Sequence, residues 1–239
     1  MTDEEKFVEN LYDEANEELK EVYRQQKEVR DKILQEIAMI MLTYTVLDGL
    51  MSIGKKDKEK IYKKLSGLII INYKNISNKE VKVLNNILES TVKKTFNFYS
   101  YNADLKDIKH IIESNFKGKH FSERVWENEN EVAKYLHKQV NNFLNGKINV
   151  NQIKKDIEKT FNTSAYNAKR LVTTEVSRCQ NEAFRKLCEE TNVKKVKRNA
   201  ILDSKTCDDC YPLNGRVYEL KDMPQISHPM CRCFYEVYE

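Results

Sequence analysis

The stretch TCDDCYPLNGRVYELKDMPQISHPMCRC, residues 206–233, holds the chemistry that organises the C-terminal part of this 239-residue chain. Zinc prefers four tetrahedral ligands drawn from thiolate sulfur and imidazole nitrogen, and a CxxC turn aims two thiolates at one point. A CxxC pair and, after seventeen intervening residues, a second group of donors supply five candidates: Cys207, Cys210, His228, Cys231 and Cys233. The pattern predicts a zinc site on which the folding of this segment depends.

These five candidates compete for four positions, and the sequence leaves two arrangements open. If residues 232–238 form a strand, Cys231 and Cys233 point to the same side and both reach the metal, so that His228 supports the site from outside the coordination sphere. In the other arrangement His228 and Cys231 complete the site, and Cys233 packs beneath it. We favour the arrangement with His228 and Cys231.

The predicted zinc is structural. A cysteine-rich site with all four positions filled holds a fold together, whereas a catalytic zinc keeps one position open for water. None of the four histidines begins an HExxH motif, which is typical of zinc proteases. We therefore expect no catalytic activity. Two further cysteines, Cys179 and Cys188, lie on or beside an apolar helical stripe, and we expect them to be small buried side chains.

The start of the chain, MTDEEKFVEN, lacks the basic residues and apolar run of a secretory signal. We expect synthesis in a reducing cytoplasm, where clustered cysteines are better interpreted as metal ligands than as a disulfide framework. The longest stretch without charge, residues 37–47, is too short to cross a bilayer as a helix, so no membrane partner is expected. With 41 basic and 37 acidic side chains, the net charge of +4 neither demands nor excludes a nucleic-acid partner.

One stripe dominates the first fifty residues. It recurs every three or four residues, at the ~3.6-residue period of an α-helix, and predicts one long helix over residues 3–50 that ends near Gly49 to Gly54. The stripe consists of Phe7, Leu11, Ala15, Leu19, Val22, Gln26, Val29, Ile33, Ile37, Ile40 and Tyr44. Beyond Ile33 a second apolar side predicts that the C-terminal half of the helix is enclosed. This second side consists of Leu34, Ala38, Met41 and Leu42.

Shorter helices are predicted next. The lysine-rich segment 55–64 leads into helices around residues 61–71 and 79–98, which polar Asn and Ser residues separate. The preceding GLMSIGKK, residues 49–56, matches the spacing of a phosphate-binding loop up to its lysine. It lacks the Ser or Thr that would hold magnesium and follows a helix, so we interpret it as a helix end.

Three helices are predicted after a looser stretch that contains Gly118. Apolar residues at helical spacing predict a helix that closes at Gly146 and then a short helix capped by Asn149 or Asn151. Ser164 is predicted to cap a longer helix that follows. We expect these helices to pack as one unit.

Glu175 lies at the flank of the apolar face of that longer helix, three residues before Arg178. As a catalytic acid or base it would need a partner and a pocket, and one carboxylate indicates neither. We predict a partly buried structural ion pair between Glu175 and Arg178.

After Asn192 the sequence changes to short segments rich in β-branched and aromatic residues. Three strands are predicted within residues 193–202, 216–220 and 232–238. The first carries four basic side chains, which could either touch phosphate or form a solvated strand face: Lys194, Lys195, Lys197 and Arg198.

The predicted fold class is α+β and mostly α. It comprises a long N-terminal helix and a helical bundle, followed by a small zinc-stabilised antiparallel β unit at the C-terminus. We divide the chain into a helical N-terminal region, residues 1–110, and a second region, residues 111–239. The second region holds helices over about residues 121–191 and the zinc β module over about residues 193–239.

Four motifs, taken together and in order, resemble the phage head morphogenesis or Mu F-like minor head protein family. They are FSERVW at 121–126, LVTTEVSRCQNEA at 171–183, DSKTCDDCYPLNGRVY at 203–218 and HPMCRC at 228–233. The resemblance runs over about residues 110–238. Its signature is a Thr-Glu helix, here with Thr174 and Glu175, then an Asp and CxxC ahead of a Gly turn, and a terminal HPxCRC.

The resemblance implies a minor component of a tailed-phage head. Such proteins are associated with the portal, so the implied partners are the portal protein and capsid or scaffold proteins, with phage DNA as a further partner that the resemblance leaves open. It implies a location in the interior of the virion, and in the host cytoplasm during assembly. No small-molecule substrate is implied.

Two other classes of function stay open. In one, the zinc unit and the basic strand bind DNA directly, as in a packaging or regulatory protein. In the other, the metal is the centre of a hydrolase or nuclease, which requires an exchangeable water on the zinc.

Overall fold

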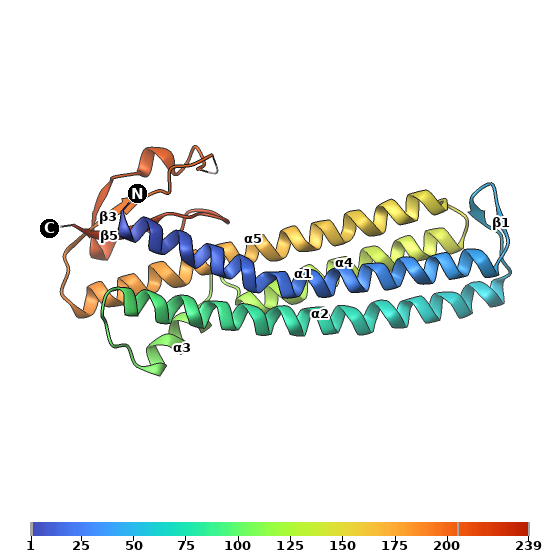
Figure 1. The fold of residues 1–239 in the computed structure, drawn as a ribbon, viewed down its shortest axis with the longest axis horizontal. Coiled ribbons are helices and arrows are strands. Elements are labelled where there is room, and N and C mark those ends of the chain that lie inside the picture. The colour runs from blue at the N-terminus through green and yellow to red at the C-terminus, as the bar shows by residue number, and fades with distance from the viewer. Residues whose placement is uncertain (1, 205, 239) are drawn as a thin grey trace. The chain divides into compact units, whose positions relative to one another are not determined.

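The computed structural model describes residues 2–204 and 206–238, and within them the chain is mostly helical, with a small antiparallel sheet near the C-terminus (Figure 1). The predicted fold class is thereby confirmed. The helices are α1 Asp3–Thr43, α2 Lys55–Phe98, α3 Leu105–Glu113, α4 Phe121–Leu144 and α5 Val150–Glu190, with the 3-10 turns η1 Tyr211–Leu213 and η2 Leu220–Asp222. The strands are β1 Val46–Leu47, β2 Leu50–Met51, β3 Lys195–Asn199, β4 Val217–Glu219 and β5 Phe234–Tyr238.

The chain forms two compact units, and each is built from separate segments of the sequence. Unit 1 comprises Met1–Leu19, Lys82–Phe121 and Lys169–Glu239, and unit 2 comprises Lys20–Val81 and Ser122–Ala168. Helices α1, α2 and α5 contribute a segment to each unit. Neither unit is a continuous stretch of the chain, so the units do not correspond to the predicted division at residue 110. That division stays a prediction.

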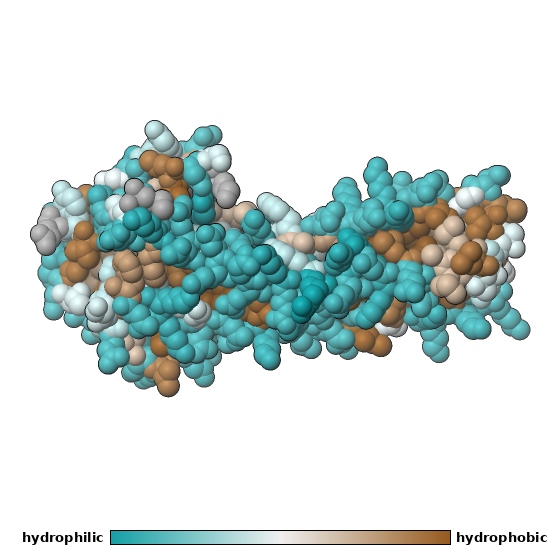
Figure 2. Space-filling view, viewed as in Figure 1, coloured by the Kyte–Doolittle hydropathy of each residue, from teal (hydrophilic) through white to brown (hydrophobic). Residues whose placement is uncertain are grey.

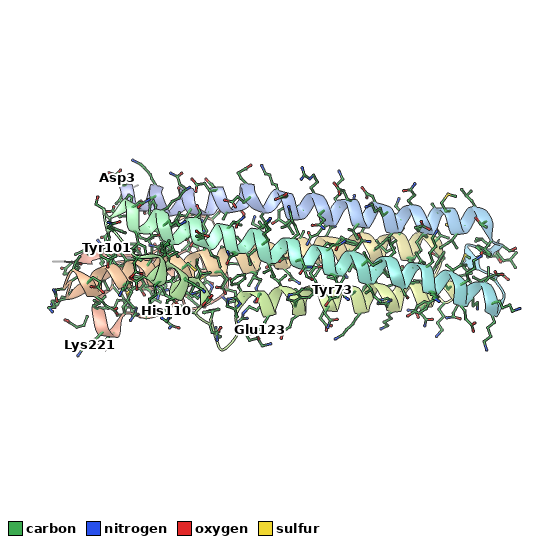
Figure 3. All side chains as sticks on the ribbon, turned by 90° about the horizontal axis from the view of Figure 1, so that it is seen from below. Asp3, Tyr73, Tyr101, His110, Glu123 and Lys221 are labelled. Atoms are coloured by element: carbon green, nitrogen blue, oxygen red, sulfur yellow. The ribbon has the colours of Figure 1, made fainter. Side chains whose placement is uncertain are left out.

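Unit 2 packs segments of α1, α2, α4 and α5 around an apolar core. The predicted stripe of α1 supplies Ile33, Ile37 and Ile40, each at most 6 % exposed. Tyr73 of α2, labelled in Figure 3, lies edge to face against Trp126 of α4, with the ring centroids 5.7 Å apart. These contacts position four helical segments by side-chain packing, and the predicted stripe of α1 faces the core.

A β-hairpin follows α1, and the predicted helix end near Gly49 to Gly54 is wrong. The helix stops at Thr43, and β1 and β2 pair across a two-residue loop of Asp48 and Gly49, with φ of 51° and 77°. Positive φ at both loop residues is the geometry of a type I′ hairpin turn, for which Asp-Gly is a favoured sequence. The Asp-Gly pair between apolar residues was the signal that could have predicted it.

The predicted enclosure of the second apolar side of α1 is confirmed for Leu34 and Met41, which pack against the core of unit 2, and is wrong for the other two residues. Leu42 is 83 % exposed, and Ala38 also lies at the surface. The consequence is an apolar surface immediately before the hairpin.

Two predicted helix breaks are absent from the described residues. Helix α2 is continuous through its polar stretch, where the Ser77 hydroxyl donates to the carbonyl of Tyr73 over 2.9 Å inside the helix. Helix α5 is continuous through Ser164, whose hydroxyl donates to Glu129 Oε1 over 2.6 Å instead of capping a new helix. Asn149 does cap α5 as predicted, since its side chain accepts from the backbone N–H of Gln152 over 2.9 Å.

Unit 1 contains the three predicted strands, in the order β4-β3-β5 with both pairs antiparallel. The last turns of α5 pack on the sheet through Phe184 and Cys188, which meet Val196 of β3 and Tyr235 of β5. Cys188 is fully buried, as predicted, and so is Cys179. No helix among those described is long and apolar enough to span a membrane.

Candidate metal centre

The CxxC segment forms a tight turn that precedes η1. The backbone N–H groups of Cys210 and Tyr211 both donate to the carbonyl of Cys207 over 3.1 Å, so the two thiols are turned toward one point. His228 approaches the same point, with its Nε2 3.0 Å from Cys207 Sγ and 3.1 Å from Cys210 Sγ. Cys231 Sγ lies 3.7 Å from Cys210 Sγ.

The structure brings all five predicted ligands together in two overlapping groups. Cys207, Cys210 and His228 form one group, and Cys210, Cys231 and Cys233 form the other, with donor atoms within 4.8 Å of one another in each. Two thiolates on a tetrahedral zinc with bonds of ~2.3 Å lie roughly 3.8 Å apart. The Cys210–Cys231 separation therefore fits a zinc site. Because Cys210 belongs to both groups, either His228 or Cys233 can be the fourth ligand.

The orientation of His228 suits it as a ligand through Nε2. Its Nδ1 lies 2.8 Å from the carbonyl oxygen of Pro229, which can only accept a hydrogen bond. The proton of the neutral ring therefore resides on Nδ1, and the lone pair of Nε2 points at the two CxxC thiols. Zinc-binding histidines are commonly held by such a hydrogen bond from the other ring nitrogen.

The cluster is buried on one side and open on the other. Cys210, Cys231 and Cys233 are each at most 4 % exposed and pack against Ala200 and Ile226. Burial raises the pKa of Cys210 to about 12, so this thiol needs a nearby cation to ionise.

A cavity of about 480 Å³ lies on the other side of the cluster, within unit 1. Cys207 and His228 line it and are only partly buried. The remaining wall includes Glu9 and Asp13 of α1 and Lys169 of α5. A metal ion can reach the cluster from this side.

Arg198 lies against the cluster, a contact that the sequence interpretation missed. Its side chain is 2 % exposed, and its Nη2 donates to Ser227 Oγ over 3.0 Å and lies 3.8 Å from Cys210 Sγ. In the part of the chain that the structure describes, no carboxylate forms an ion pair with it. Because a buried cation needs a compensating charge, the thiols are its available anionic partners.

The interpretation of the basic strand as an open phosphate-binding surface is wrong for Arg198. In β3, Val196 and Arg198 are two residues apart and both point inward, as strand alternation requires. That alternation is the signal that could have placed Arg198 inside. Lys195 and Lys197 face outward and form ion pairs with Glu219 and Glu236.

Three side chains of α5 bind the backbone of the cluster segment. The hydroxyl of Thr174 accepts from the N–H of Met230 over 3.0 Å, and the side-chain amide of Asn181 donates to the carbonyl of Cys233 over 3.0 Å. Arg185 donates to the carbonyl of Met223. These residues are spaced by seven and four positions, so one helical face holds the whole segment.

Glu175 and Arg178 form an ion pair in the same helix, with Arg178 Nε 2.7 Å from Glu175 Oε2 and both side chains buried. The guanidinium also donates to the carbonyl of Ile111 over 2.7 Å and to the hydroxyl of Ser114 over 2.6 Å. Ile111 lies in the last turn of α3, whose carbonyls have no partners inside the helix. The pair therefore joins α5 to the end of α3.

Comparison with protein families agrees with the motifs. Residues 131–236 match the family model described as Phage Mu protein F like protein. The match includes all five cluster residues together with Glu175 and Arg178, whereas FSERVW at 121–126 precedes it. The resemblance is confirmed for this part of the chain. No curated protein and no solved structure matches the chain.

Proposed function

We propose that this chain, whose residues 131–236 belong to the Phage Mu protein F like family, is a portal-associated minor head protein that carries a structural zinc ion. The family match makes it a phage head-related protein. The finer assignment is supported most by one observation. The Cys/His cluster is held against the Thr-Glu helix by the hydrogen bond between Thr174 and Met230, so that the motifs of the family meet at a single place.

Zinc would act as a clamp in this position. Cys207 and Cys210 precede η1, while His228, Cys231 and Cys233 precede β5, so four of these five ligands on one ion would tie two irregular segments together. Those segments have little apolar core of their own, because among the described residues the cluster packs with only Ala200 and Ile226. Small modules of this kind commonly depend on a metal for folding. The ion supplies cross-linking rather than chemistry.

The absence of catalysis is part of the proposal. Three sulfur donors of the cluster are buried, and a site filled by thiolates and one imidazole leaves no position for a reactive water. The absorption spectrum of the cobalt-substituted protein tests this. A closed tetrahedral, sulfur-rich site supports the structural role, and a five-coordinate spectrum with an exchangeable water would make the chain a candidate hydrolase.

The proposed partners are the portal protein and capsid or scaffold proteins, and the proposed location is the virion interior after assembly in the host cytoplasm. In this proposal residues 111–239 form the Mu F-like domain and the helical region of residues 1–110 provides contacts with the assembly. Co-expression with the portal protein of the same phage, followed by isolation of portal rings, tests the association. Rings that never retain the chain would contradict it.

A second candidate, direct DNA binding, has weaker support. Lys194 is an exposed basic side chain of the segment, but Arg198 is buried, and Lys195 and Lys197 have carboxylate partners. Salt-dependent binding of duplex DNA that is lost on charge reversal at Lys194, Lys195 and Lys197 would favour it.

A further inference from the structure

We propose that the β1–β2 hairpin of unit 2 is a docking point for another protein, whose contact surface combines an apolar depression with acidic side chains. Leu47 and Leu50 are partners across the turn and are 60 % and 37 % exposed. Leu42, at 83 %, and Met39, at 53 %, precede them on the last turns of α1. Figure 2 shows hydrophobic side chains gathered over this part of unit 2. Contiguous exposed apolar groups of this kind mark interaction sites.

The hairpin is held in place, so its leucines are not exposed by fraying. Met51 is buried in the core of unit 2, and its carbonyl lies close to Gly146, where an added Cβ would approach it to 3.1 Å. The backbone N–H of Val150 donates to the carbonyl of Gly49 over 3.2 Å. A loop that is already fixed in its binding conformation loses little conformational entropy on association.

Charge identifies the partner's chemistry. Two segments surround the hairpin: residues 39–64, which contain it, and residues 145–155, which contact it through Gly146 and Val150. Together they carry nine lysines against three acidic side chains. Lys55 and Lys56 at the start of α2 are exposed, and neither has an ion-pair partner in the described part of the chain. A complementary surface is acidic, and a second copy of this chain would be repelled by the same lysines.

Asp48 favours a protein over an anionic membrane. It occupies the apex of the turn between Leu47 and Leu50 and is exposed, so its carboxylate would enter a lipid surface together with the leucines. Desolvation and repulsion from anionic headgroups oppose that entry. A protein can hydrogen-bond the carboxylate at the edge of an apolar depression. Nucleic acid offers phosphates to the lysines but no apolar pocket to the leucines.

Site-specific photo-crosslinking in cells that assemble phage heads tests the proposal. The full-length chain carries benzoylphenylalanine in place of Leu47, and the matched control carries it in place of Tyr166, an exposed aromatic residue of the same unit. The expected result is one major protein adduct from position 47 that position 166 does not give. Mass spectrometry should place it on an apolar residue flanked by Asp or Glu. No position-47 adduct, an adduct to lipid, or an adduct to a second copy would overturn the proposal.

A charge test accompanies the crosslink. Lys55→Glu with Lys56→Glu should reduce the adduct roughly tenfold, whereas Lys27→Glu with Lys74→Glu, at exposed positions of the same unit, should leave it unchanged. Equal yields of the crosslinked adduct in the two double variants would contradict an acidic partner. The inference rests on the proposed function only for the partner's identity. If the crosslinked acidic protein is not a phage head protein, the docking surface is supported and the proposed head role is contradicted.

Discussion

The backbone N–H of Met230 donates to the hydroxyl of Thr174 over 3.0 Å, across 56 positions of sequence. Met230 follows the His-Pro pair and adopts φ of 62°, a left-handed conformation that costs free energy for a residue with a side chain. The hydrogen bond to α5 compensates for that cost and fixes the turn that carries His228 and Cys231. This contact joins the Thr-Glu helix to the HPxC turn in this chain.

Replacing Thr174 by valine keeps the shape of the side chain and removes the acceptor. The N–H of Met230 is then left without its partner, which we expect to lower the free energy of unfolding by about 1–3 kcal/mol. Thr174→Ser should retain most of the stability. Urea unfolding measures the difference, and Thr163→Val, at an exposed position of α5, is the matched control. If Thr174→Val and Thr163→Val lower the free energy of unfolding equally, the contact between Thr174 and Met230 does not stabilise the fold as predicted.

The ligand choice predicts different metal contents for two single variants. If His228 completes the site, His228→Ala should lose zinc, while Cys233→Ser should keep about one ion per chain. Metal analysis of the purified proteins decides between them, and Cys207→Ser provides a reference that should lose zinc in either arrangement. Zinc retained by His228→Ala and lost by Cys233→Ser would establish the alternative set. In the metal-free variants we expect unit 1 to lose the structure of its cluster segment.

The features that were predicted correctly rest on local sequence patterns. The stripe of α1 and the Cys/His spacing each follow from one periodicity or one ligand preference, and the structure contains both features. Ser164 was wrongly predicted to cap a helix, because its hydroxyl donates to Glu129, a partner on another helix that no local pattern contains. Arg198 was also placed wrongly: its partners are distant in sequence, although the alternation of β3 could have placed its side chain inward. Two kinds of feature were therefore missed: contacts with a partner far along the chain, such as Ser164 with Glu129, and local signals that were not used, such as the Asp-Gly turn of the hairpin.

Arg198 should affect the metal through charge. Replacing it by methionine keeps much of its length but removes the cation beside the thiolates, and we expect zinc affinity to fall about 10- to 100-fold, as for other residues that support metal ligands. Arg198→Lys should recover part of the loss, which a purely packing role would not give. Competition with a chromophoric chelator measures the affinity. Arg216→Met is the control, because Arg216 is exposed and, among its described contacts, its side chain donates only to the carbonyl of Pro212.

Glu80 makes the stability of unit 2 depend on pH. Its side chain is 1 % exposed, and desolvation, together with repulsion from buried Glu129, raises the pKa of its carboxyl from 4.5 to about 8. The unfolded chain releases this proton near pH 4.5 and the folded chain only near pH 8. The stabilising contribution of the neutral carboxyl is therefore complete below pH 4.5 and is lost as the pH rises toward 8.

Between these values the free energy of unfolding should fall with a slope of up to about 1.4 kcal/mol per pH unit from this group. Glu80→Gln keeps a neutral side chain of the same shape and should flatten the slope and stabilise the protein at pH 8. Urea unfolding from pH 5 to pH 9 provides the measurement. Glu28→Gln, at an exposed position of α1, should leave the profile unchanged. Parallel profiles for Glu80→Gln and the wild type would contradict the raised pKa of Glu80.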